Sequence, residues 1–242
     1  MANRLDTDCD GLWRFMSEQE LFKQAAEAVA RSKALVFAAG AGMGVDSGLP
    51  DFRGTEGFWR AYPAIAKLGI EFEEMANPLW FQKAGFHSER VMECHGALEQ
   101  LQCTKACNQT VWKAGPEEIE IDEESFRTRG PLPKCPYCGS LARPNVLMFG
   151  DGAWVQDRTA EQRARMMSWQ KPISESNEPI TVLEFGAGTA VPSVRHFSEA
   201  IAKLNGATLI RVNPRESSVP KGHIGIALGA LAGIEGINSM LQ

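Results

Sequence analysis

Four cysteines fall into two close pairs that suit a metal ion. Cys103 and Cys107 have the spacing C-x3-C, and Cys135 and Cys138 follow after residues 108–134 with the spacing C-x2-C. Two such pairs supply four thiolates that can close a tetrahedron around Zn²⁺, which leaves no open position for catalysis. We therefore predict a structural zinc site. The alternative is four unrelated buried thiols.

One of the four histidines stands directly before a glycine, in the sequence Glu93-Cys94-His95-Gly96. An imidazole that is neutral near physiological pH can accept a proton from a sugar hydroxyl. His95 is therefore a candidate general base. The alternative is an ordinary histidine in the core or on the surface.

A glycine-rich stretch follows the apolar run at residues 34–39. The sequence Gly-Ala-Gly-Met-Gly occupies residues 40–44, and Asp51-Phe52-Arg53 stands between a proline and a glycine. Glycines after a buried strand let backbone N–H groups approach a phosphate, which favours a dinucleotide site. In this interpretation Phe52 stacks on the cofactor, Arg53 faces phosphate or ribose, and Asp51 fixes the loop. The alternative is a turn with a surface ion pair.

The elements that must position these residues form an α/β pattern. Strands are predicted at 34–39, 180–185 and 207–212, and helices at 17–32, 64–76, 159–170, 194–204 and in the tail 222–241. The first run is expected to be a strand buried on both faces of a parallel sheet. Residues 91–96 are expected to be a short strand, and residues 1–16 a loose arm or a short capping piece.

Two further loops follow predicted strands. Gly186-Ala187-Gly188 follows the second strand, and Asn213 follows the third. Ligands of open α/β sheets bind at the carboxyl ends of the strands, so both loops are candidate cofactor sites. The alternative is two ordinary turns.

Composition excludes several classes of protein. The 242 residues carry a net charge of −5, which argues against a nucleic-acid partner held through phosphates. No apolar run approaches the length of a membrane helix, and the N-terminus lacks the pattern of a secretory signal. We therefore expect a cytoplasmic protein, in which six cysteines are more typical of metal ligands and thiols than of disulfides.

Taken together, these motifs resemble the sirtuin (Sir2) family of NAD-dependent protein deacylases. The resemblance rests on residues 40–54, 93–96, 143–151, 186–192 and 212–214 together with the cysteine quartet, all in the order typical of that family. It implies an α/β fold, with a Rossmann-like parallel sheet and an inserted small zinc-ribbon module. The implied NAD-binding domain comprises residues 1–86 and 152–242, and the implied zinc module comprises residues 87–151.

The resemblance also implies roles for individual residues. His95 matches the catalytic histidine, and an acylated-lysine peptide pairs with a segment that includes Val146, Met148, Phe149 and Gly150. The amide oxygen of the acyl-lysine attacks the ribose carbon as nicotinamide leaves, and His95 then takes a proton from a ribose hydroxyl. The implied cofactor-binding residues are Gly40, Ala41, Gly42, Asp51, Phe52, Arg53, Gly186, Ala187, Gly188 and Asn213.

The sequence departs from the family pattern at three places. Gly44 replaces a usual serine, and Gly186-Ala187-Gly188 replaces a usual Gly-Thr-Ser. The third departure follows Phe81, where the family carries a segment with a Thr-Gln-Asn-Ile-Asp motif, and no Asn-Ile-Asp occurs in this chain. Two alternatives to a deacylase therefore remain, a catalytically impaired protein that binds NAD or ADP-ribose, and an NAD glycohydrolase. The acyl group, the target protein and the oligomeric state are not specified by the sequence.

Overall fold

The computed structural model describes residues 4–7, 13–43, 81–82, 84–115, 121–122, 127–148 and 150–241. The chain divides into two compact units. The first comprises Met1–Gly57 and Gln170–Gln242, and the second comprises Phe58–Trp169. Each unit has its own main sheet.

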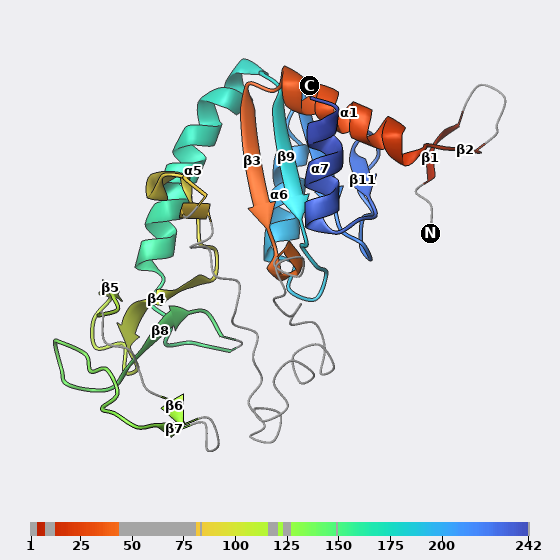
Figure 1. Ribbon diagram of the computed structural model, residues 1–242. Coiled ribbons are helices and arrows are strands. Elements are labelled where there is room, and N and C mark those ends of the chain that lie inside the picture. Colours follow the sequence, from red (N-terminus) through yellow and green to blue (C-terminus); the bar gives the residue numbers. More distant parts are fainter. Residues whose placement is uncertain are drawn as a thin grey trace. The chain divides into compact units, whose positions relative to one another are not determined.

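The first unit is built on a parallel sheet, in which the described residues contribute four strands (Figure 1). They are β3 (Ala34–Ala39), β9 (Ile180–Phe185), β10 (Ala207–Val212) and β11 (Ile224–Ile226), in the order β11-β10-β9-β3. Strand β9 pairs along its whole length with β3 and with β10. The predicted strands and the Rossmann-like parallel sheet are confirmed. Strand β11 lies where a helix was predicted, and the helix of that tail begins later.

Helices cover both faces of this sheet (Figure 1). Helices α1 (Glu18–Arg31) and α7 (Ala230–Ser239) pack on one face, and α6 (Ser193–Ala202) packs on the other. Helix α1 begins at the predicted capping box, where Ser17 Oγ accepts from the N–H of Glu20 at 3.2 Å. The Glu20 carboxylate accepts from the N–H of Ser17 at 2.8 Å, so two N–H groups at the helix start are satisfied.

Strand β3 is not buried on both faces, and that prediction was wrong. Ala34, Val36 and Ala38 are buried in the core beneath α6, whereas Leu35 is 39% exposed and Phe37 is 42% exposed. The core formed with α1 and α7 draws its sheet residues from β9, β10 and β11. Among the described strands β3 lies at the edge of the sheet, and none of its residues belongs to the core formed with α1 and α7. The face of β3 that carries Leu35 and Phe37 is therefore not covered by these two helices.

The second unit contains an antiparallel sheet and the start of a long helix. Its strands are β4 (Gly96–Cys103), β5 (Trp112–Lys113) and β8 (Ala142–Val146), in the order β5-β4-β8. A separate hairpin pairs β6 (Ile121–Asp122) with β7 (Arg127–Thr128). A short 3-10 helix, η2 (Ser88–Arg90), precedes the sheet. Helix α5 (Asp157–Ser176) follows it and confirms the predicted helix at 159–170.

Two local predictions were wrong. Strand β1 (Arg4–Thr7) pairs with β2 (Trp13–Phe15) in the segment that was expected to be a loose arm. Residues 91–95 form no strand, because the backbone turns at Cys94 and His95 and strand β4 begins only at Gly96. The apolar character of residues 91 and 92 therefore reflects packing and not strand pairing.

Two buried amides connect β4 and β8 to the chain that leads into α5. Asn145 Nδ2 donates to Gln102 Oε1 at 2.9 Å and to the carbonyl oxygen of Val155 at 2.8 Å. Gln102 Oε1 also accepts from the N–H of Val155 at 3.0 Å, and Gln102 Nε2 donates to the carbonyl oxygen of Ala153 at 2.8 Å. Both side chains are fully buried, so these bonds fix the strands relative to the segment that follows.

Candidate functional site

The glycine loops after β3 and β9 lie against each other in the first unit. The N–H of Gly40 donates to the carbonyl oxygen of Phe185 at 2.9 Å, and the N–H of Gly42 donates to that of Gly186 at 3.1 Å. A Cβ atom at Gly40 would lie 2.6 Å from the Cα atom of Ala187. Glycine at positions 40 and 42 therefore allows the two loops to pack closely. From the sequence, these glycines were instead expected to permit the close approach of a ligand.

Gly186 makes the same packing possible from the other side. Its φ of +59° lies in the left-handed region, and a Cβ atom there would lie 2.2 Å from the backbone nitrogen of Met43. Within the described part of the chain, the N–H groups of Ala187 and Gly188 have no acceptor. The structure thus brings together six of the predicted cofactor residues, namely Gly40, Ala41, Gly42, Gly186, Ala187 and Gly188.

Asn213 holds the loop after β9 against the turn after β10. Its Nδ2 donates to the carbonyl oxygen of Ala187 at 3.0 Å. Its Oδ1 accepts from the N–H groups of Arg215 at 3.0 Å and Glu216 at 2.9 Å. Asn213 is buried and both ends of its amide bind other parts of the protein. Its predicted contact with a ribose stays a prediction.

Sequence reasoning missed Arg195 and Glu216, which support the same loop. Arg195 Nη2 donates to the carbonyl oxygens of Ala187 at 3.0 Å and Glu216 at 2.7 Å. The Glu216 carboxylate accepts from the N–H of Thr189 at 3.1 Å and from its hydroxyl at 2.7 Å. Burial lowers the pKa of Arg195. No motif marks these residues, because the interactions join α6, a loop and a turn that are separate in the sequence.

Four of the predicted site residues lie outside the described part of the chain. They are Asp51, Phe52 and Arg53 of the predicted cofactor loop and Phe149 of the predicted substrate segment. Gly44 and residues 45–80, which include the predicted helix at 64–76, also lie outside it. The roles given to these residues therefore stay predictions.

His95 lies in a tight turn of the second unit. The N–H of Gly96 donates to the carbonyl oxygen of Glu93 at 3.0 Å and closes this turn. His95 Nδ1 lies 3.7 Å from Cys94 Sγ. Burial lowers the pKa of His95 and raises the pKa of the Cys94 thiol. A histidine with a lowered pKa is neutral at physiological pH, which is the form that a general base requires.

The predicted substrate segment begins directly beside His95. The carbonyl oxygen of His95 accepts from the N–H of Leu147 at 2.9 Å, and Gly96 pairs with Val146 at the start of β4. Val146 is buried and Met148 is half-buried, whereas Gly150 is exposed. The structure therefore places the candidate base and this segment next to each other within one unit.

An ion pair closes the loop that contains this segment, and sequence reasoning missed it. Arg143 Nη2 donates to Asp151 Oδ2 at 2.5 Å, and Arg143 Nη1 donates to the carbonyl oxygen of Val146 at 3.4 Å. Asp151 Oδ1 also accepts from the N–H of Ala153 at 3.1 Å. Arg143 and Asp151 stand at the two ends of residues 143–151, so their charges hold the ends of the loop together.

The four predicted cysteine ligands form one cluster. The Sγ atoms of Cys103 and Cys138 lie 3.6 Å apart, as do those of Cys107 and Cys135, and all four lie within 4.8 Å of one another. A tetrahedral zinc ion with Zn–S bonds of about 2.3 Å has S–S edges of about 3.8 Å. The cluster therefore fits Zn²⁺ and uses all four positions of a structural site.

The thiols of this cluster differ in acidity. Hydrogen bonds from Ser140 lower the pKa of Cys138 to about 6. Hydrogen bonds within the cluster, with Cys138 first, raise the pKa of Cys107 to about 12. A zinc ion bound at neutral pH must therefore displace a proton from Cys107, as is usual for thiolate ligands.

Most of the second unit matches the model of a known protein family. A family model described as the Sir2 family matches residues 80–168. The matched residues include His95, the four clustered cysteines and the first part of α5.

Individual relatives match more of the chain. The NAD-dependent protein deacylase 2 of Archaeoglobus fulgidus is 28% identical over 177 residues, which cover 55% of this chain and 66% of that protein. The NAD-dependent protein deacylase of Pyrococcus abyssi is 28% identical over 239 residues, which cover 81% of this chain and 88% of that protein. A solved structure of a mutant Sir2 homologue in complex with ADP-ribose has a TM-score of 0.49 and 24% identity, covering 90% of this chain and 95% of that chain.

Proposed function

We propose that this chain is a member of the Sir2 family and acts as an NAD-dependent protein-lysine deacylase. Such a transferase moves the acyl group of an acylated lysine to ADP-ribose and releases nicotinamide. The names of the archaeal relatives support this activity. The observation that carries the proposal is the hydrogen bond between His95 and Leu147, since it joins the candidate base to the candidate substrate segment.

In the proposed reaction His95 accepts a proton from a ribose hydroxyl. Its burial supports this role, since the lowered pKa keeps the imidazole neutral. The segment Val146, Met148, Phe149 and Gly150 holds the acylated-lysine peptide by strand-like backbone pairing. The ion pair between Arg143 and Asp151 stabilises the conformation of that segment by joining its two ends.

NAD, when bound, supplies the ADP-ribose acceptor and the nicotinamide leaving group. The first unit offers backbone N–H groups of Ala187 and Gly188 that have no acceptor among the described residues, and these suit phosphate oxygens. Gly40, Ala41 and Gly42 lie beside them, and Asp51, Phe52 and Arg53 are assigned to the same cofactor by resemblance. Asn213 orients this loop through its bond to Ala187.

The zinc module and the location belong to the same proposal. Zn²⁺ held by the cysteine cluster has a structural role, because four thiolates complete its coordination. We assign residues 87–151 to the zinc-binding module and residues 1–86 and 152–242 to the NAD-binding domain.

A membrane-spanning helix is absent from the part of the chain that the structure describes. The proposed location is the cytoplasm.

One assay tests the proposed activity. Loss of NAD is followed with and without an acetyl-lysine peptide, for the wild type and for His95→Ala. A deacylase consumes NAD only with the peptide, and His95→Ala forms no deacylated product. Consumption of NAD without any peptide would identify a glycohydrolase instead.

The remaining outcome is binding without turnover. The chain lacks the Asn-Ile-Asp sequence that the family resemblance places at the nicotinamide end of NAD, which favours an impaired binding protein as the second candidate. Calorimetric binding of ADP-ribose, with no NAD loss under either condition, would establish that candidate.

A further inference from the structure

Glu93, two residues before His95, is held by three side chains of α5. It is buried, with a side chain that is 4% exposed. Gln162 Oε1 accepts from the N–H of Glu93 at 2.9 Å, and Gln162 Nε2 donates to Glu93 Oε2 at 2.9 Å. Arg158 forms an ion pair with the same carboxylate oxygen. One amide thus holds both the backbone and the side chain of Glu93.

The third side chain acts on the turn that contains His95. Thr159 Oγ1 donates to the carbonyl oxygen of Glu93 at 3.2 Å. That oxygen also accepts the turn-closing bond from the N–H of Gly96. Thr159 and Gln162 are both buried, so water does not compete strongly for these bonds.

The other end of the turn is equally fixed. Gly96 has a φ of +85°, and a Cβ atom there would lie 1.9 Å from the carbonyl oxygen of Asn145 in β8. His95 therefore stands between a glycine pressed against β8 and a glutamate held by α5. Because only Cys94 separates Glu93 from His95 in the same turn, we expect a shift of Glu93 to move the imidazole.

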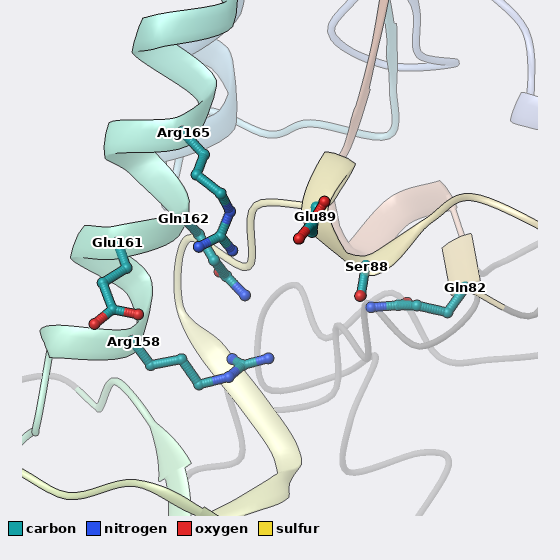
Figure 2. Close-up of a pocket in the computed structure, with 7 residues that line it drawn as sticks. All are labelled: Gln82, Ser88, Glu89, Arg158, Glu161, Gln162 and Arg165. Atoms are coloured by element: carbon teal, nitrogen blue, oxygen red, sulfur yellow. The ribbon is translucent and has the colours of Figure 1, made fainter.

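We propose that Gln162, together with Thr159 and Arg158, positions His95 for its role as the base. This inference rests on the proposed deacylase function. The three residues act through Glu93, so they are positioning residues and not catalytic ones. Arg158 and Gln162 also face a cavity of about 310 Å³, opposite Gln82, Ser88 and Glu89 (Figure 2). This space allows side chains of similar size at position 162 without overpacking.

Matched variants separate positioning from general damage. Gln162→Leu removes both bonds to Glu93 at similar volume. The exchange Glu93→Gln with Gln162→Glu restores both bonds. The backbone N–H of residue 93 donates to the new carboxylate at 162 as before, and the side-chain bond is reversed, because the new amide at 93 donates to that carboxylate. Glu161→Gln is the control, since Glu161 lines the same cavity from α5 and no bond joins it to Glu93 in the described structure.

Two activities of each variant are measured. Exchange of labelled nicotinamide into NAD reports the step before His95 accepts a proton, and formation of deacylated peptide reports the step that needs the base. Gln162→Leu is expected to lose about tenfold or more in deacylation while nicotinamide exchange stays within about twofold. The double exchange recovers most of the loss, and Glu161→Gln matches the wild type. Equal losses in both activities, or no recovery in the double exchange, would overturn the proposal.

A second measurement does not depend on turnover. The chain has four histidines, so the ring signal of His95 is assigned in labelled protein by its absence in His95→Ala. Gln162→Leu is expected to shift or broaden this signal, and the double exchange to restore it. If the wild type shows neither nicotinamide exchange nor deacylation, the proposed function fails. The spectrum then still tests whether Gln162 positions His95. An unchanged His95 signal in Gln162→Leu would refute it.

Discussion

Arg211 and Glu184 stand directly opposite each other on β10 and β9 and form an ion pair that is closed to solvent. Arg211 is 1% exposed and Glu184 is 0% exposed. The guanidinium bonds both carboxylate oxygens of Glu184, and its Nη2 also donates to Glu199 Oε1 at 2.9 Å. Its Nη1 donates to the carbonyl oxygen of Ser218 at 2.5 Å. The pair therefore ties the centre of the sheet to α6 and to the loop after β10.

Removal of one partner of this pair should destabilise the first unit strongly. Arg211→Met leaves the carboxylate of Glu184 buried without its counter-charge, and the free energy of unfolding should fall by about 3–5 kcal/mol. Urea unfolding measures this loss. Lys171→Ala is the control, because it removes an exposed ion pair with Glu175 and should cost less than about 0.5 kcal/mol. A loss below about 1 kcal/mol for Arg211→Met would contradict the expected role.

Removal of zinc should destabilise the second unit, which contains the four clustered cysteines. Purified protein is expected to contain about one zinc ion per chain, and Cys135→Ser should abolish binding, because it removes a buried ligand. Elemental analysis measures the content, and chelator-treated protein should become sensitive to protease in residues 96–146. Cys94→Ser should retain its zinc, because Cys94 lies outside the cluster. Zinc well below one per chain in the wild type would contradict the site.

The pH dependence of activity should reflect the burial of His95. Because burial lowers its pKa, the neutral base persists below the ordinary histidine value of about 6.5, and activity should fall only at lower pH. Stability should also fall at low pH. The folded state favours the neutral imidazole of His95, so the free energy of unfolding decreases as the pH falls below the pKa of the unfolded chain. An NMR titration of the His95 ring should give a midpoint below that of the urea-unfolded chain. A higher midpoint in the folded protein would refute this expectation.

Gly186→Ala should separate the two glycine loops. The new Cβ would lie 2.2 Å from the nitrogen of Met43, at a φ of +59°. We expect a loss of about 1–3 kcal/mol in the free energy of unfolding and weaker binding of ADP-ribose by calorimetry. Gly152→Ala is the control, because a Cβ atom there meets nothing within 4 Å. Unchanged binding in Gly186→Ala would show that the loop packing does not support the site.

Local signals in the sequence predicted much of the fold. Runs of apolar residues located β3, β9 and β10, and the capping box at Ser17 and Glu20 located the start of α1. The exposure of Leu35 and Phe37 was not predicted, because it depends on which elements cover β3. Strand β11 was missed because Ile224-Gly225-Ile226 is too short, in a tail rich in Gly and Ala, to be told from a helix.

Some features of the candidate site were likewise predicted from the sequence, and others were not. The cysteine cluster follows from two short spacings. The role of the substrate segment was predicted only through family resemblance, and its position beside His95 was not predicted. The bonds between Glu93 and Gln162 join residues that are far apart in the sequence and that match no motif. The same holds for Arg195 and Glu216. Interactions of this kind emerge only when the fold brings the residues together.

The buried amides of Gln102 and Asn145 limit how this chain can change over evolutionary time. Each is the other's hydrogen-bond partner, and both also bind the backbone at residues 153–155. A single replacement leaves polar groups unpaired at zero exposure, whereas a joint replacement can restore the pairing. Among related sequences these two positions should therefore change together or not at all.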